Sequence, residues 1–134
     1  MELDFLSITV ATIISIFFVI FYYSDLLFGE IWREEVGITN SDLQVIKKNL
    51  PLTLATFFVL NFCIAVVLEF LFLQLGIVTV KEVVFYVMIF WVGFFGVTTL
   101  ANNLIEGRSF RLFIIKTLYQ FLNFLLIGTF LVLI

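Results

Sequence analysis

The fold is decided by the stretch WVGFFGVTTLANNLIEGRSFR, which runs from Trp91 to Arg111. An almost wholly apolar chain here takes in two adjacent asparagines and Glu106, and then reaches Gly107 and Arg108. Apolar runs long enough to cross a bilayer lie on both sides of this polar segment. The stretch therefore predicts a membrane hairpin with its turn at the cytoplasmic surface.

The composition points to the same environment. Of the 134 residues, 63% are hydrophobic and 13% are charged, whereas a soluble domain has about 45–50% apolar and about 25% charged residues. The formal net charge of -3 is spread along the chain and forms no basic patch, which excludes nucleic acid as a partner. We expect a single-domain integral membrane protein whose main partner is the lipid bilayer.

The reactive side chains are few. The chain has no histidine and one cysteine, Cys63, inside an apolar run, so a disulfide or a thiolate metal cluster cannot form within the chain. A general acid or base would have to be Glu69, Glu106, Lys116 or a tyrosine. We therefore predict no metal, no cofactor, no catalytic residues and no enzymatic activity.

Four apolar runs are long enough to cross a hydrocarbon core of about 30 Å. They are too long and too continuously apolar for the strands of a β-barrel. The predicted fold is an all-α bundle of four transmembrane helices in one domain, residues 1–134, with spans at about 5–23, 52–74, 83–105 and 112–134.

Basic residues predict the orientation. Connections 24–51 and 106–111, with the start of the fourth span, hold Arg33, Lys47, Lys48, Arg108, Arg111 and Lys116, and the other side holds Lys81. Positively charged loops stay in the cytoplasm. Both termini are therefore expected outside.

The first connection is too long for a simple turn, and it predicts one or two short amphipathic helices at the membrane surface. Asp25 to Val36 has helical spacing and precedes Gly37, and a second helix is expected from an N-cap at Ser41 to about Asn49. Aromatic residues gather at membrane–water interfaces, and the expected anchors here are Tyr22, Tyr23 and Trp32.

Polar side chains inside the spans are the candidate functional residues, because such groups normally face the bundle interior. Counting along the helices brings Thr12, Ser15, Asn61, Gln120 and Asn123 to roughly mid-membrane. Two interpretations stay open: hydrogen bonds that hold helices together, or a polar path or ligand pocket. The candidate ligand-binding residues are Asn61, Asn102, Glu106, Arg108, Tyr119, Gln120 and Asn123.

Two segments resemble the small bacterial and archaeal membrane proteins grouped as domain of unknown function 1761. The first is Tyr23 to Trp32, followed by Gly37 to Thr39, and the second is Thr98 to Arg108, with Tyr119 and Gly128 in the last span. Gln120 stands where the family pattern often has a histidine. The resemblance implies a four-span protein of the prokaryotic cytoplasmic (inner) membrane whose activity is not established.

Two functions remain open at this point. In the first, the protein binds or conducts a small solute through its polar core, and a path enclosed by so few spans would require a homo-oligomer. In the second, it is a non-catalytic accessory or assembly subunit of a larger membrane complex. The scarcity of reactive groups and the small extramembrane area motivate the second function, and the shared depth of the polar side chains motivates the first.

Overall fold

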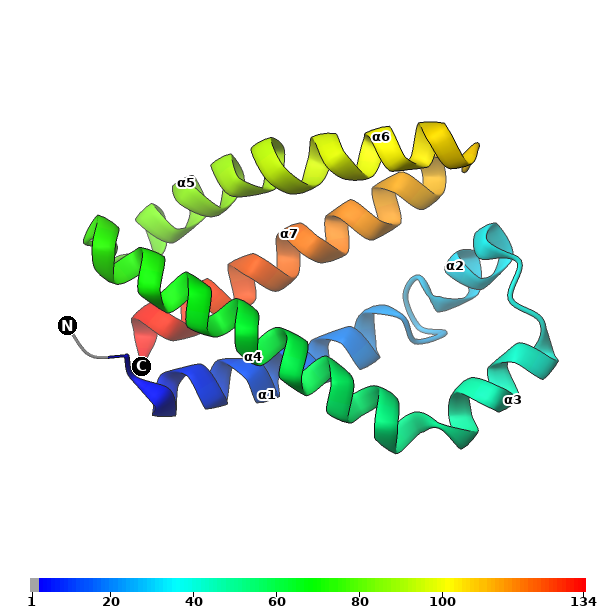
Figure 1. Cartoon of the computed structure of the whole chain (residues 1–134), viewed down its shortest axis with the longest axis horizontal. Coiled ribbons are helices and arrows are strands. Elements are labelled where there is room, and N and C mark those ends of the chain that lie inside the picture. The colour runs from blue at the N-terminus through cyan, green and yellow to red at the C-terminus, as the bar shows by residue number, and fades with distance from the viewer. Residues whose placement is uncertain (1–2) are drawn as a thin grey trace.

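The computed structural model describes residues 3–134, and every regular element in that range is helical (Figure 1). The elements, in chain order, are α1 Phe5–Tyr22, α2 Gly29–Val36, α3 Asn40–Lys48, α4 Leu50–Leu75, α5 Val80–Phe90, the π-helical turn η1 Trp91–Gly96, α6 Val97–Glu106 and α7 Phe110–Leu133.

Four of these helices are long and apolar enough to cross a membrane: α1, α4, the continuous helix α5–η1–α6, and α7. The last two are joined at Gly107, as the turn in the stretch Trp91 to Arg111 predicts. The predicted all-α, four-span membrane fold is thus confirmed. We call α5–η1–α6 the third span.

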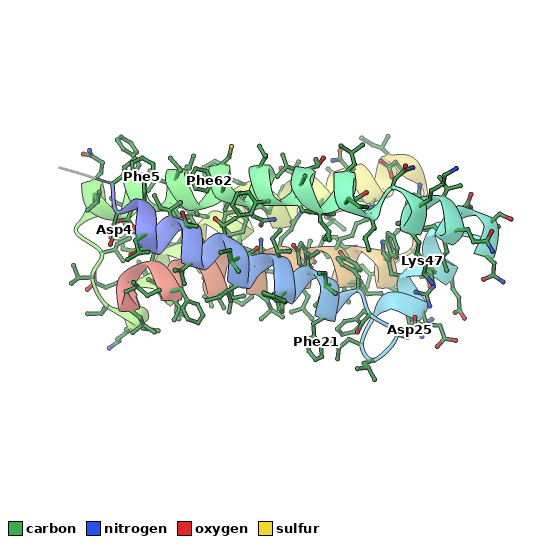
Figure 2. All side chains as sticks on the ribbon, turned by 90° about the horizontal axis from the view of Figure 1, so that it is seen from below. Asp4, Phe5, Phe21, Asp25, Lys47 and Phe62 are labelled. Atoms are coloured by element: carbon green, nitrogen blue, oxygen red, sulfur yellow. The ribbon has the colours of Figure 1, made fainter. Side chains whose placement is uncertain are left out.

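The two ends of the bundle differ in their number of basic side chains. Figure 2 shows Asp4 and Phe5 at one end and Asp25 and Lys47 at the other. We name the first the terminal end, because the C-terminus also lies there (Figure 1). We name the second the basic end, and it contains Arg33, Lys47, Lys48, Arg108 and Arg111.

The two predicted surface helices are present between α1 and α4, with different starts. The first begins at Gly29 rather than Asp25, and Gly37 ends it with φ 83° in the left-handed conformation. The second is capped by Thr39 rather than Ser41, because Thr39 and Asp42 form a reciprocal capping box. Both helices lie at the basic end (Figure 1).

Helix α7 is the centre of the bundle. It packs against α1 and α4 on one side and against the whole third span on the other. The third span packs mainly on α7 and diverges from α4 towards the basic end (Figure 1). Of its most apolar window only 11% is buried, against 28% to 39% in the other three spans.

The hydrophobic core lies towards the terminal end, where four spans meet. Gly128 of α7 makes the closest approach: a Cβ there would lie 2.8 Å from Cγ1 of Val83 and 3.1 Å from the ring of Phe72. The buried residues of this hydrophobic core are Ile8, Ala11, Ala65, Leu68, Phe72, Ile77, Val83, Val87, Ile127 and Leu131.

Candidate functional site

Three polar side chains from three spans meet in the middle of the bundle. The hydroxyl of Ser15 donates to Oδ1 of Asn61 at 2.9 Å and to Oδ1 of Asn123 at 2.7 Å, the two alternatives of one proton. Nδ2 of Asn123 also donates to Oδ1 of Asn61 at 2.9 Å. We call Ser15, Asn61 and Asn123 the amide cluster. It links α1, α4 and α7.

The amide cluster is closed. None of its members is more than 3% exposed. Nδ2 of Asn61 donates back to the carbonyl of Phe57 at 2.9 Å, and the hydroxyl of Thr12 bonds the carbonyl of Ile8 at 2.7 Å. Such mutually satisfied groups are typical of contacts that fix helix packing in a membrane. The geometry favours the packing interpretation of these residues over a polar path.

Aromatic rings fill the space at the basic end of α1. Tyr22 is 1% exposed, and its hydroxyl donates to the carbonyl of Ile115 at 2.6 Å. It therefore lies in the core, whereas Tyr23 packs at a tilt against Trp32, with ring centroids 5.2 Å apart. Tyr119 packs against both tyrosines, with its ring centroid 5.3 Å from each of theirs. The candidate Tyr119 thus belongs to a packed aromatic cluster.

The hairpin turn holds the other candidates. Glu106 pairs with Arg108 at 3.2 Å, and both side chains are exposed. Asn102 is exposed, whereas Asn103 is 4% exposed and its Nδ2 donates to the carbonyl of Ser109 at 3.0 Å. The asparagine that closes the turn is therefore Asn103, which the candidate residues did not include.

Glu35 of α2 reaches the same turn. Its carboxylate accepts a hydrogen bond from the hydroxyl of Ser109 and lies 3.7 Å from the guanidinium of Arg111. These contacts hold α2 against the start of α7. The structure thus distributes the candidate residues over the amide cluster, the aromatic cluster and the hairpin turn, with Gln120 outside all three, and it does not gather them into one site.

An open apolar groove lies between α4 and the third span, and sequence reasoning missed it. Its volume is about 570 Å³. One wall comes from α4, the other from the third span, and Phe124 of α7 lies between them. The lining residues are Cys63, Ile64, Val67, Leu68, Leu71, Phe90, Phe94, Phe95 and Phe124.

The π-helical turn η1 shapes the far wall of this groove. It places the consecutive residues Phe94 and Phe95 along the groove, and Phe95 packs on Phe124 with centroids 4.8 Å apart. Nε1 of Trp91 donates to the carbonyl of Thr117 at 2.8 Å and ties the turn to α7. Single π-helical turns occur frequently at functional sites. The two glycines of WVGFFG were the sequence signal available for it.

Gln120 has a different environment from the amide cluster. Its Oε1 is shielded by the protein and has no hydrogen-bond partner among the described residues. It lies on α7 one helical turn from Phe124, towards the basic end. Gln120 is not among the residues that line the groove, so its Oε1 is an oxygen buried within the bundle.

A smaller pocket of about 180 Å³ lies at the terminal end, next to Glu69. Glu69 is 9% exposed and lies near Asp4, which caps α1. Hydrogen bonds from the hydroxyl and backbone amide of Ser7 lower the pKa of the Asp4 carboxyl. Among residues 3–134 no three His, Cys, Asp or Glu side chains gather as ligands for a metal ion.

Comparison with known proteins gives one match. A family model described as "Protein of unknown function (DUF1761)" matches residues 6–132, which is nearly the whole chain. No curated protein and no solved structure matches the chain.

Proposed function

We propose that this chain, which belongs to the DUF1761 family of proteins of unknown function, is a non-enzymatic membrane protein that binds an apolar small molecule taken sideways from the bilayer. The observation that carries the proposal is the groove between α4 and the third span. Small-molecule sites are mostly apolar concavities of about 300–1,000 Å³, and the groove's volume of about 570 Å³ falls in that range.

The position of the groove supports entry from the membrane. Val67 and Phe94 line it and are 55% and 68% exposed on a part of the chain that spans the bilayer. Apart from Cys63, its lining side chains are hydrocarbon, so a polar solute would find no hydrogen-bonding partner there. Its occupant is therefore a molecule already dissolved in the membrane.

Of the two activities expected of a polar core, binding is better supported than conduction. The amide cluster is nearly inaccessible, and its side chains bond one another. A conduction path would therefore have to lie between protomers of an oligomer rather than inside one bundle. With its basic end in the cytoplasm, the proposed location is the prokaryotic inner membrane.

The second candidate is an accessory or assembly subunit, and the outer face of the third span favours it. Thr98 and Asn102 lie one turn apart on α6 and are exposed. Polar side chains at membrane depth tend to bond across helices. On this alternative, a helix of another copy or another protein covers α6, and a stoichiometric complex would survive gentle extraction.

Photo-cross-linking tests the groove. The protein in lipid nanodiscs is exposed to dodecyl methyl ether carrying a diazirine, and the attached sites are mapped by mass spectrometry. Val67→Trp fills the groove, whereas Val59→Trp makes the same change on α4 at a position of similar exposure, 59%, that does not line it.

We expect labelling concentrated on the groove residues, lost in Val67→Trp and kept in Val59→Trp. Uniform labelling of all lipid-facing helices, unchanged by Val67→Trp, would overturn the binding proposal. Recovery of the protein only with a stoichiometric second chain over α6, with the groove unlabelled, would establish the subunit alternative instead.

A further inference from the structure

We infer that the smaller pocket at the terminal end binds a small amine, whose ammonium group pairs with the carboxylate of Glu69 and whose apolar body packs on the pocket walls. This pocket is separate from the groove, because the two share no lining residue. The inference therefore goes beyond the proposed function and depends on no part of it.

The first step concerns the Glu69 carboxylate. Glu69 lines the pocket, and only 9% of its surface is exposed. The other described lining residues are all apolar: Phe72, Leu73, Ile77, Val78, Leu131 and Val132. A buried carboxylate is costly unless a partner compensates its charge. The pocket thus presents one anionic side chain among hydrocarbon walls.

The second step concerns the partners that the chain itself offers. The backbone amide of Asp4 donates to the Glu69 carboxylate, which fills one of about four acceptor positions on its two oxygens. The Asp4 carboxylate is close enough to repel it. Lys81 is the basic residue at this end, and no ion pair within residues 3–134 includes Lys81 or Glu69. The described part of the chain therefore supplies no cation to Glu69.

The third step is access. Glu69 lies six residues before Leu75, the last residue of α4, which is about 9 Å along the helix. The pocket continues past that end to Ile77 and Val78, and Val78 is 72% exposed. The pocket therefore opens where the terminal end of the bundle meets the membrane surface. A water-soluble molecule can enter there, which is not true of the groove.

The fourth step is the size and charge of the occupant. The pocket has a volume of about 180 Å³, and a cavity of about 150 Å³ holds benzene. An anion would be repelled by Glu69 and Asp4, and a neutral molecule would leave the charge of Glu69 uncompensated. A calcium or magnesium ion needs about six or more oxygen ligands, whereas the lining offers one carboxylate.

A primary ammonium group meets these conditions. It is a cation with three hydrogen-bond donors, and it forms strong, charge-assisted bonds to a carboxylate. The rest of the molecule has to be apolar and about the size of one ring, because it contacts Phe72 and aliphatic side chains. Such a group comes either from a free amine in the water or from the headgroup of an aminophospholipid in the bilayer.

Two matched probes test the inference: benzylamine, which is charged at neutral pH, and benzyl alcohol, which carries the same ring and is neutral. Each is titrated by saturation-transfer NMR against the protein in phosphatidylcholine nanodiscs, and the signal from empty nanodiscs is subtracted. Wild-type protein is expected to bind benzylamine more tightly by about ten-fold or more, the value of a hydrogen bond to a charged group.

The variants locate the difference. Glu69→Gln keeps the size of the side chain, removes the charge and should abolish the preference for benzylamine. Glu82→Gln removes a carboxylate at the same end that does not line the pocket, and it should leave the preference intact. Equal binding of both probes by wild-type protein, or a full preference in Glu69→Gln, would overturn the inference.

A second variant decides the matter if Glu69→Gln does not fold. Val78→Trp covers the pocket from an exposed position and leaves Glu69 in place, so it should weaken the binding of benzylamine. Val59→Trp is the same change at a position of 59% exposure outside the pocket and should have no effect. Unchanged binding in Val78→Trp would assign the amine to another place and overturn the inference.

Bilayer composition identifies the source of the ammonium group. If phosphatidylethanolamine in the nanodiscs weakens the binding of benzylamine to wild-type protein, the lipid headgroup competes for the pocket and is its occupant. Unchanged binding assigns the pocket to a free amine. Neither result bears on the groove, whose labelling by the diazirine probe is measured separately.

Discussion

The two sides of α7 are built from the same kinds of residue and behave differently. On one side, α1 and α4 meet α7 through the amide cluster, which is nearly inaccessible. On the other side, the third span and α4 leave an open apolar groove over Phe124 of α7. Two neighbouring residues of α7 thus belong to different contacts: Asn123 to the closed amide cluster and Phe124 to the open groove.

The difference shows which interactions bring two helices into close contact in a membrane. Lipid chains are as apolar as leucine, so apolar area alone does not drive two spans together, and close packing and hydrogen bonds decide. The α1–α4–α7 side has three mutually bonded side chains. The third span has the bond from Trp91 to Thr117 and the close contact at Gly128. It is therefore the part of the bundle that can leave room for a ligand.

The largest effect is expected from Asn123→Leu, which removes one member of the amide cluster that joins α1, α4 and α7. It removes the bond from Ser15 and the bond to Asn61, and leaves the bond from Ser15 to Asn61 as the only one in the cluster. We expect a loss of about 2–3 kcal/mol in the free energy of unfolding, measured by denaturation in mixed micelles. Asn102→Leu, at an exposed asparagine, is the control and should cost little. Equal losses in both variants would contradict the special role of the amide cluster.

Gly128→Ala should have the next largest effect, since it pushes on the seam between α7 and the third span. The added Cβ would lie 2.8 Å from Cγ1 of Val83, and overpacking of this kind costs about 1–3 kcal/mol. The matched control is Gly93→Ala, where an added Cβ meets nothing within 4 Å. Thermal unfolding of both variants in the same detergent tests this. A tolerated Gly128→Ala would show that α5 can shift on α7 without loss.

Trp91→Phe should loosen the third span alone. A smaller aromatic ring replaces the indole and the bond to the carbonyl of Thr117 is lost, and the lost bond costs about 1 kcal/mol. Hydrogen exchange read by mass spectrometry should quicken in η1 and α6 and stay unchanged in α1 and α4. Faster exchange throughout the bundle would mean that the two sides unfold together and are not separately stabilised.

The smallest effect is expected on the pH dependence of stability, through Asp4 at the start of α1. Hydrogen bonds from Ser7 lower the pKa of Asp4 in the folded protein, so the carboxylate stabilises the start of α1 above its unfolded pKa of about 4. This contribution is lost as the pH falls through the lower, folded pKa. Melting temperatures between about pH 5 and pH 2 should fall less in Asp4→Asn than in wild type. Parallel curves would show that Asp4 does not titrate with folding.

The sequence by itself determined the fold class, the four spans, the two surface helices and the turn at Gly107. Each of these depends on information held in a short window: the length of an apolar run, a left-handed glycine such as Gly37, or a polar segment between two spans. It also brought Ser15, Asn61 and Asn123 to one depth, because rise per residue is constant in a helix.

Only the tertiary structure decided which way each helix faces. The spans are apolar on nearly every side, so their patterns do not say which face is buried. Rotation about the helix axes therefore placed Tyr22 in the core and Asn103, rather than Asn102, against the turn. It also paired Asn123 and left Oε1 of Gln120 without a hydrogen-bond partner among residues 3–134. The groove and η1 depend on how α4 and the third span diverge around α7, and no single span contains that information.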